Sequence, residues 1–553
     1  MKTIGKYFIC GLVSLFGLTA CVNDLNVTPK DENNIIGFHQ DQVFSKCYAT
    51  LAVTGQKGPN GAGDVDGIDE GTSSFYRMIW EMQVCPTDEV WVPWNDPGLP
   101  EIRTITWNSL NALVKGLYYR LYFDIALCNH FLENASSDGD GATQIQEVRF
   151  IRALNYYYLL DMYGNVPFAD KVNASHKPQY SREQMFSWLE TELKDLEQNL
   201  PEKRLTDFRV DRYAAKLLLA RLYLNAEVYT GTPQWQNAAD YALEIINGPY
   251  KLHTTSLGGI YSPYQEMFMG DNYRVIGGEH GEGILNIYQD GPFTQSWGGA
   301  LFLIAGPREK TVYVNPATSE GWAGFRCTPE FLSIWVDMDR TPEILLDEFE
   351  MPQELGDDRA IFCSVLNTGL PVVHADTSIH NIDSIRPRGN FSFHDSWSML
   401  KWTGRYIENP LGEEITIQPH DPQFTDTDIP FLRAAEAYLT YAEAVHRGAS
   451  ANGMSAKEAV QALRDRANNV QDFELSDQFF LDEWAREFYA EGRRRIDLVR
   501  FGKFTGPDAD LHWEGRGGRK SNEGWMALDE KYNIYPIPNS DIVAGNHTQN
   551  PGY

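Results

Sequence analysis

Cysteine is scarce in this 553-residue sequence, and the few cysteines are not arranged as ligands. No CxxC pair occurs, so the spacing predicts neither a zinc site nor a dense disulfide framework. Two of the seven lie in the leader described below. The other five predict mainly buried free thiols, with one or two bridges left open: Cys47, Cys85, Cys128, Cys327 and Cys363. Stability must therefore come mainly from a large hydrophobic core.

Positive charge is also in short supply. Lysine and arginine number 47 against 76 aspartates and glutamates, which gives a net charge of −29 at pH 7. A chain this acidic repels phosphate backbones and anionic lipid, so nucleic acid is not an expected partner. This negative charge is compatible with neutral ligands and with cations.

The local signatures of common enzymes are missing. None of the motifs GxSxG, HExxH, GxxxxGK[ST] or GxGxxG occurs, and the twelve histidines show no ligand spacing. A pair of catalytic carboxylates, as in glycoside hydrolases, needs no such motif and stays open as an alternative. The sequence therefore favours a protein that is not an enzyme.

Long apolar runs are absent after the N-terminus, where one short run has the form of an export signal. Lys2 and Lys6 precede a mostly apolar stretch, residues 7–18, that is too short to span a membrane as a helix. The segment Leu18-Thr19-Ala20-Cys21 resembles the lipobox of bacterial lipoproteins, in which the cysteine is lipidated. A plain secretory signal is the alternative. We expect a signal over residues 1–20, then lipidated Cys21 with a flexible tether to residue 34.

Helical periodicity dominates the rest of the chain. Apolar residues recur at three- and four-residue spacing in segments that predict packed helices. The clearest are at 148–158, 213–226, 431–445 and 482–501, and weaker ones at 110–134, 182–199, 234–247 and 455–468. Small alanines opposite large aromatics between residues 213 and 246 are similar to tetratricopeptide packing.

The middle of the chain, residues 250–425, has a different composition. It is rich in Gly, Pro, Thr and aromatic residues and contains short alternating runs such as residues 283–288. That pattern predicts long loops with a few strands. The expected fold is mainly α, a helical scaffold interrupted by a large irregular insertion.

A charged segment near the C-terminus could be read as an anion site. Two oppositely charged pairs stand four residues apart there, Asp482 with Arg486 and Glu491 with Arg495. Such pairs can form on one helix face, so we expect these arginines to brace helices and loops.

Several blocks of this sequence together resemble the SusD/RagB-type outer-membrane lipoproteins. The blocks lie at 149–153, 163–167, 429–444, 484–502, 535–538 and 550–553, and they span nearly the whole chain after the leader. The resemblance implies a SusD-like fold in which four tetratricopeptide-like helix pairs support an irregular region that carries a glycan site. A single body over 35–553 follows, with the scaffold mainly at 110–250 and 429–502. Glycan-binding loops are expected mainly at 54–108 and 250–425.

The same resemblance implies a location and a partner. Members of this family are outer-membrane lipoproteins of Gram-negative bacteria that face the cell exterior and bind glycans. Their partner is a SusC-like TonB-dependent transporter, which they cover as a lid.

Further blocks at 54–58, 66–71, 75–77 and 86–89 are similar to the starch-binding members of the family. In those members an aromatic arc cups maltooligosaccharide, and its positions match Trp94, Trp297 and Trp322 here. Indole offers a flat apolar face to the CH face of a sugar ring. Asp69 and Arg77 match polar positions of that site. Asn95 is the expected amide partner, and Asp96 could replace it because the chain is shorter here.

The resemblance also implies a structural calcium, although no cofactor is required. Asp426 and Asp428 precede a helix and resemble a calcium-coordinating segment, with Asp271 as a third ligand. Hard carboxylate oxygens suit calcium. Helix capping by Asp428 is the alternative.

The expected function is non-catalytic capture of starch or maltooligosaccharides and delivery to the transporter. Three alternatives stay open. The same fold could bind another α-glucan such as dextran. The chain could be a secreted glycoside hydrolase, or a tetratricopeptide scaffold that binds peptides.

Overall fold

A computed structural model describes most of the chain. The described residues are 37–172, 177–308, 318–335, 356–363, 398–407, 420–507, 509, 519–521, 524–526 and 528–553. The predicted signal, Cys21 and the tether lie outside them. Among these residues, no helix has the length and apolar character needed to cross a membrane.

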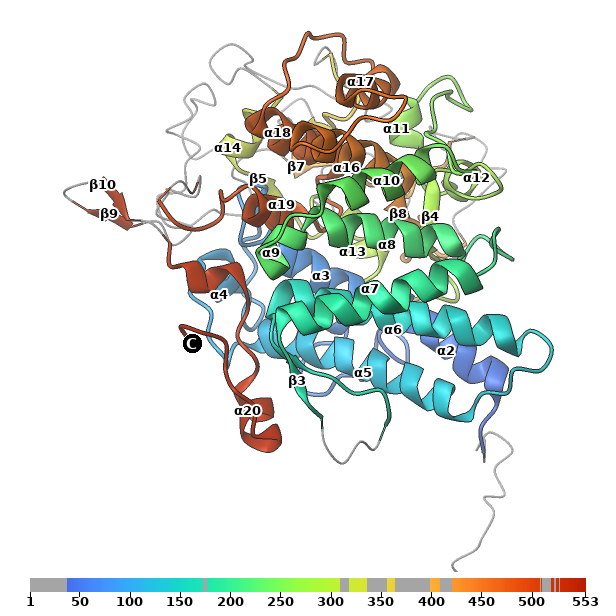
Figure 1. Ribbon diagram of the computed structural model, residues 1–553. Helices are drawn as coiled ribbons and strands as arrows, with labels where there is room; N and C mark the ends of the chain where they lie inside the picture. The colour runs from blue at the N-terminus through green and yellow to red at the C-terminus, as the bar shows by residue number, and fades with distance from the viewer. Residues whose placement is uncertain are drawn as a thin grey trace, which may run out of the picture.

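A stack of long helices forms the body of the molecule (Figure 1). Each helix packs against the next in the order α5, α6, α7, α8, α10, α16 and α17. Their bounds are Ala112–Asn134, Gly141–Tyr163, Arg182–Asn199, Arg212–Leu224, Trp235–Ile246, Ala434–His446 and Ala456–Arg466. Six of the predicted helical segments are therefore confirmed to within a few residues or lie inside a longer helix.

Local sequence signals account for where these helices begin and end. Ser181 and Ser455 each accept a hydrogen bond from the backbone N–H three residues on, and Gln184 and Glu458 bond back to complete capping boxes. Gly164 ends α6 with a positive φ of 72°, which glycine adopts at little cost because it has no side chain.

Shorter helices complete the fold around the stack. On the N-terminal side, α2 (Gln40–Ala52) and α3 (Phe75–Val84) pack against α5. The others are η1 (Gly71–Ser73), α4 (Leu99–Arg103), α9 (Ala226–Thr230), α11 (Pro263–Glu266), α12 (Tyr273–Ile276), α13 (Ala300–Ala305), α14 (Pro329–Leu332), α18 (Asp477–Phe488), α19 (Arg494–Arg500), η3 (Glu530–Asn533) and α20 (Asn539–Gly545).

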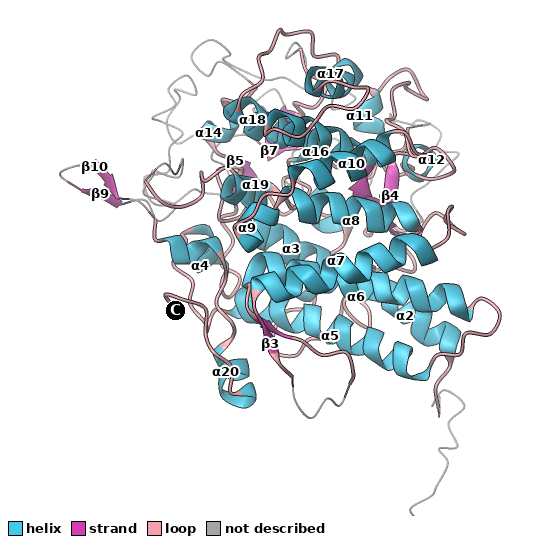
Figure 2. Cartoon of the chain, viewed as in Figure 1, coloured by secondary structure: helices cyan, strands magenta, loops and turns pink. Residues whose placement is uncertain are grey.

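The strands are short, and the hairpin of β9 (Arg519–Ser521) and β10 (Gly524–Met526) projects away from the helices (Figure 2). β4 (Gly283–Ile287) pairs antiparallel with β8 (Ile429–Arg433), as the alternating run at 283–288 predicts. β1 (Val90–Trp91), β5 (Arg326–Cys327), β7 (Ser398–Met399) and β6 (Phe362–Cys363) form a four-stranded sheet in that order. The remaining pairs are β2 (Val166–Pro167) with β3 (Gln179–Tyr180), and β9 with β10.

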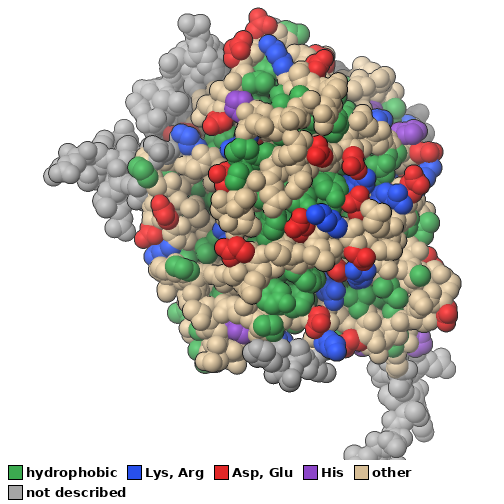
Figure 3. All heavy atoms as spheres, in the orientation of Figure 1, with side chains coloured by type: hydrophobic (Ala, Val, Ile, Leu, Met, Phe, Trp, Pro, Cys, Tyr) green, Lys and Arg blue, Asp and Glu red, His purple; other side chains and the backbone are tan. Residues whose placement is uncertain are grey.

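One continuous hydrophobic core runs through the helical stack and under the loop region. Cys85 and Cys327 lie in this core, and Cys47 and Cys128 lie in a second, smaller cluster with Phe44 and Phe131. All four are buried, as expected. On the face in Figure 3, acidic and basic side chains lie interspersed across the helices.

Two of the predicted helical segments are interrupted. The prediction of a helix from residue 431 is wrong at its start, because residues 429–433 form β8 and the helix begins at Ala434. The segment 482–501 is not one helix, because α18 ends at Phe488 and α19 begins at Arg494. Between them Ala490 and Gly492 have φ of 58° and 74°, which a continuing right-handed helix excludes.

That break changes the predicted ion pairs. Arg486 pairs with Glu483 at 3.0 Å in place of Asp482. Glu491 lies between the helices and bonds to Arg433 at 2.8 Å, so its predicted pairing with Arg495 is wrong. Arg495 instead donates to the Asn533 carbonyl at 2.5 Å.

The expectation that the arginines of this region brace helices and loops is confirmed. Glu487 on α18 is fully buried and bonded to Arg466, to Arg433 at 2.7 Å and to Arg359 at 3.3 Å. Burial alone would raise the pKa of Glu487, but these guanidiniums outweigh it and lower the pKa to about 2. We call this set, Glu487 with Arg359, Arg433 and Arg466, the Glu487 network.

Candidate functional site

The three predicted tryptophans come together at one place in the loop region. The ring centroids of Trp322 and Trp94 are 6.0 Å apart, and those of Trp322 and Trp297 are 6.2 Å apart. The rings are inclined to each other by 68° and 55°, and each side chain is partly exposed. We call Trp94, Trp322 and Trp297 the tryptophan arc, with Trp322 at its centre.

Trp94 follows β1 in a loop that is held by hydrogen bonds and by close packing. Its indole N–H donates to the Trp322 carbonyl at 3.3 Å, and Arg103 donates to the Trp94 carbonyl at 2.7 Å. A side chain at Gly324 would place its Cβ 2.2 Å from the Trp94 ring, so only glycine fits there. Trp91, three residues earlier, is buried in β1.

Trp322 and Trp297 rest on a small hydrophobic cluster of Leu301, Ala305 and Phe424. The Trp322 indole N–H donates to Glu320 at 3.3 Å, and the Trp297 indole N–H donates to the Pro59 carbonyl at 3.1 Å. All three indole N–H groups therefore have partners within the protein. This holds the rings in place and leaves their apolar faces as the parts that can contact a ligand.

Arg77 lies behind Trp94 and is almost fully buried. Its Nε donates to Glu81 at 2.9 Å, and its guanidinium carbon lies 4.8 Å from the Phe302 ring centroid and 5.6 Å from that of Trp94. Burial raises the pKa of Glu81, opposed by the charge of Arg77. In this arrangement Arg77 supports Trp94 and directs one Nη toward the loop carboxylate of Asp96, at 3.9 Å.

The other predicted polar residues lie at the edges of the arc. Asp69 is exposed, and its Oδ2 accepts from the Thr72 N–H at 3.3 Å. Asn95 is exposed on the Trp94 loop, and Asp96 beside it is the one near Arg77. Their roles stay predictions.

Sequence reasoning missed the residues that support the arc from below. Glu70 is buried and accepts from Thr54 and from the Trp297 backbone N–H at 3.3 Å; its burial raises its pKa. Gln423 donates to Glu320 at 2.9 Å and so holds the partner of Trp322. These residues come from segments more than a hundred positions apart. Glu70 lies in the block at 66–71, but that resemblance assigns it no role, and Gln423 lies in no motif.

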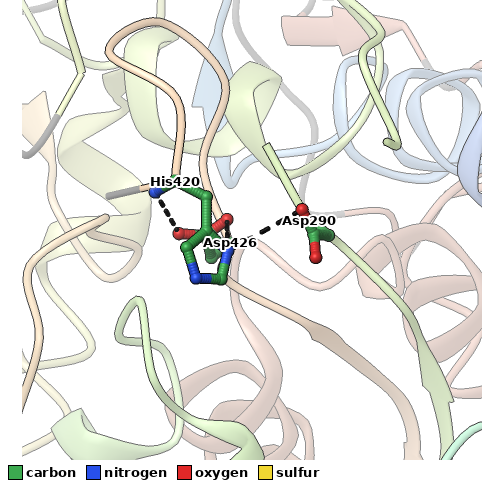
Figure 4. Close-up of side chains that lie close together, drawn as sticks. All are labelled: Asp290, His420 and Asp426. Atoms are coloured by element: carbon green, nitrogen blue, oxygen red, sulfur yellow. Dashed lines mark hydrogen bonds and ion pairs between the residues drawn. The ribbon is translucent and has the colours of Figure 1, made fainter. Parts of the chain in front are cut away.

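The predicted calcium ligands are arranged differently from the expectation. Within the described residues, the group whose ligand atoms all lie within 4.8 Å of one another is Asp290, His420 and Asp426 (Figure 4). Only Asp426 is common to the two sets. A calcium ion here stays a prediction.

The other two predicted ligands have protein partners. Asp271 accepts from the Ile407 N–H at 2.7 Å and pairs with Arg274 at 3.2 Å. Asp428 accepts from the Gln289 N–H at 2.7 Å, and its burial raises its pKa well above the usual range. The capping alternative for Asp428 does not describe this geometry either, since β8 and not a helix follows it.

Two family models match the chain. One, described as the SusD family, covers residues 397–553. The other, described as starch-binding associating with outer membrane, covers residues 90–224.

Curated relatives extend the match to the full length. Starch-binding protein SusD of Bacteroides thetaiotaomicron is 35% identical over 100% of this chain and 99% of its own length. SusD-like protein P2 of Formosa agariphila is 27% identical over 44% of this chain and 46% of its own length.

Solved structures show the same fold at low identity. Surface glycan-binding protein A of Bacteroides thetaiotaomicron, in complex with laminarihexaose, is 19% identical with a TM-score of 0.62, covering 93% of this chain and 99% of its own. A SusD superfamily protein of Parabacteroides distasonis is 16% identical with a TM-score of 0.63, covering 93% and 98%.

Proposed function

The chain belongs to the SusD family, and from that premise we propose that it is a non-catalytic glycan-binding protein of the cell surface. It captures starch-type α-1,4-glucans on the tryptophan arc and passes them to a SusC-like TonB-dependent transporter. A lipid on Cys21 anchors it in the outer membrane of a Gram-negative bacterium.

One observation carries the proposal: three partly exposed indoles with satisfied N–H groups stand together, with Trp94 and Trp297 on either side of Trp322. Each outer ring is inclined to the Trp322 ring by more than 50°, so the three rings form a curved surface. An α-1,4-glucan curls, and its successive apolar faces can meet such a curve. A flat β-glucan would contact fewer of the rings.

The expected affinity is modest. Each stacked ring contributes about 0.5–1.5 kcal/mol beyond area burial. Three rings with a few hydrogen bonds reach ~4–7 kcal/mol, which corresponds to dissociation constants of roughly 1 mM to 10 µM. Weak binding of this kind suits a protein that must release its glycan to a transporter.

The polar groups at the rim would set the register of the sugar. Asp69 is exposed and can accept from hydroxyls, and Asp96 stands next to Arg77. Asn95 on the same loop offers an amide. Acceptors beside an apolar arc match a ligand that is apolar on its face and polar at its rim.

Affinity electrophoresis in amylopectin, dextran and a β-glucan tests the proposal, with Trp322→Ala run beside the wild type. We expect retardation by amylopectin that the variant loses. Retardation by dextran alone would support the same binding site with dextran, and not starch, as its ligand. Hydrolysis of amylopectin would support the hydrolase alternative, and binding that survives Trp322→Ala would overturn the arc as the site.

A further inference from the structure

The loop that carries Trp297 also carries two other exposed aromatic side chains. It leaves β4 at Ile287 and reaches α13 at Ala300. On the way, Tyr288 is 38% exposed and Phe293 is 82% exposed. Aromatic rings gathered on one exposed loop next to a candidate site mark a surface that can contact a ligand.

At the far end of this loop is an open cavity. The Tyr288 ring lies 4.3 Å from the ring of Phe208, and Phe208 lines a cavity of about 820 Å³. The cavity lies between the segment 202–213, which joins α7 to α8, and the turns at Pro249–Tyr250 and Gly278–Glu279. Its size is that of a small-molecule site.

The walls of the cavity are fixed by hydrogen bonds. Asp207 accepts from the Gly278 N–H at 2.7 Å and so joins two of its sides. Arg204 is buried and donates to the carbonyls of Gly278 at 2.6 Å and Gly283 at 2.9 Å. A preorganised cavity loses less freedom when a ligand enters it.

The loop between Tyr288 and Trp297 is held in place by one neighbouring segment, residues 421–426. Phe424 lies 5.2 Å from the Trp297 ring, and Asp421 accepts from Gln295 at 3.2 Å. Asp426 accepts from the Gly291 N–H at 2.8 Å, next to Asp290, which binds the Tyr288 hydroxyl at 2.8 Å. The loop is therefore anchored along its length, from the arc to the cavity.

The geometry points to a second carbohydrate subsite, formed by Phe293, Tyr288 and the cavity beside Phe208, that holds the continuation of an α-glucan chain bound on the tryptophan arc. This inference rests on the proposed function. Aromatic faces can stack on sugar rings, and the exposed side chains at the rim can bond hydroxyls.

The charges around the cavity favour a neutral chain. Lys203 and Glu279 pair with each other at 2.8 Å, and Arg204 is committed to backbone carbonyls. The basic groups are therefore already paired, and an anionic ligand would also face the carboxylates of Asp207 and Glu202.

Calorimetric titration with maltotriose and with a long linear maltodextrin tests the inference. Maltotriose can occupy the arc alone, whereas the long chain can reach the subsite. We expect Phe293→Ala and Tyr288→Ala each to weaken binding of the long chain about 2- to 10-fold and to leave maltotriose binding unchanged. Val543→Ala, an exposed apolar side chain on α20, is the control and should change neither.

Hydrogen exchange supplies a readout that needs no substitution. The long chain should protect amides in 202–213 and 288–294, and maltotriose should not. Equal effects of the variants on both sugars, or no protection beyond the arc, would overturn the subsite and leave the arc intact. If Trp322→Ala still binds both sugars, or if the wild type binds neither, the proposed function is overturned and the subsite with it.

Discussion

Glu487 and Trp322 stand in two regions of this molecule that are built in opposite ways. Around Glu487, charged side chains are buried and paired, and three arginines surround one carboxylate. Around Trp322, apolar rings stay partly exposed, and the indole N–H groups bond to acceptors within the protein. In the first region the charged groups bond to one another, and in the second the apolar ring faces stay open to a ligand.

The difference separates what identifies the family from what chooses the ligand. The block at 484–502 is among the clearest family resemblances, and most of its arginines, together with Glu487, lie in the interior of the scaffold. Such residues therefore identify the fold and do not select the ligand. The arc is assembled from loops, where substitutions alter binding at little cost to folding.

The largest effect is expected from Glu487→Gln, because it removes the charge that three buried guanidiniums share. Breaking a buried ion pair costs about 3–5 kcal/mol, and we expect a loss of that size in the free energy of unfolding. Urea unfolding measures it. Lys194→Gln, which breaks an exposed pair with Glu190, is the control and should cost less than about 1 kcal/mol. An equal loss of unfolding free energy in the two variants would contradict the claim that the buried Glu487 network stabilises the fold more than an exposed ion pair does.

Acid should weaken the scaffold next. Glu436, Glu443 and Glu487 each have a pKa lowered to about 2 by arginines that outweigh burial. Their unfolded pKa is about 4.3, so their contribution is complete above that value and is lost as the pH falls toward 2. Unfolding free energy should therefore fall between about pH 4 and pH 2 in a denaturant series. Constant stability over that range would contradict the role given to the arginines.

Trp322→Ala should act on binding and much less on folding. Trp322 contacts both other rings of the arc, so its loss should weaken α-glucan binding at least ~10-fold, about 1.4 kcal/mol. Trp322→Phe keeps a flat face and should lose only ~2- to 3-fold. Calorimetry with maltoheptaose measures both variants. A phenylalanine variant as weak as the alanine variant would argue against stacking.

The smallest effect is expected at the rim of the arc. Asp69→Asn keeps the shape of the side chain and removes its charge. A neutral sugar should lose about 2- to 5-fold in affinity, or about 0.4–1 kcal/mol, because the amide oxygen still accepts a hydrogen bond and only the contribution of the charge is lost. The same calorimetry tests it, with Asp66→Asn as a neighbouring exposed control. A loss of affinity as large as that of Trp322→Ala would show that the Asp69 carboxylate contributes as much to binding as the Trp322 ring does.

The helical stack could be predicted from the sequence because a 3.6-residue apolar period directly encodes a buried helix face. The errors lie where that period is interrupted by tertiary structure. Residues 429–433 keep apolar spacing and yet pair with β4, and the turn at Ala490 and Gly492 divides an apparently continuous helix.

The arc could not be derived from periodicity at all. Its rings stand at positions 94, 297 and 322, so the site depends on loop closure over more than two hundred residues. Family resemblance supplied those positions, and the structure brings them together. Glu320 and Gln423, which hold Trp322, lie in no pattern that one sequence can reveal. The block at 66–71 contains Glu70 but does not show that Glu70 bonds to Trp297.

A crystal structure of the protein with bound maltoheptaose tests the central claim most directly. We predict glucose rings stacked against Trp94, Trp322 and Trp297, with the Glu487 network unchanged. Maltoheptaose bound elsewhere, with the three indoles still facing solvent, would contradict the claim that this surface is where the protein holds its glycan.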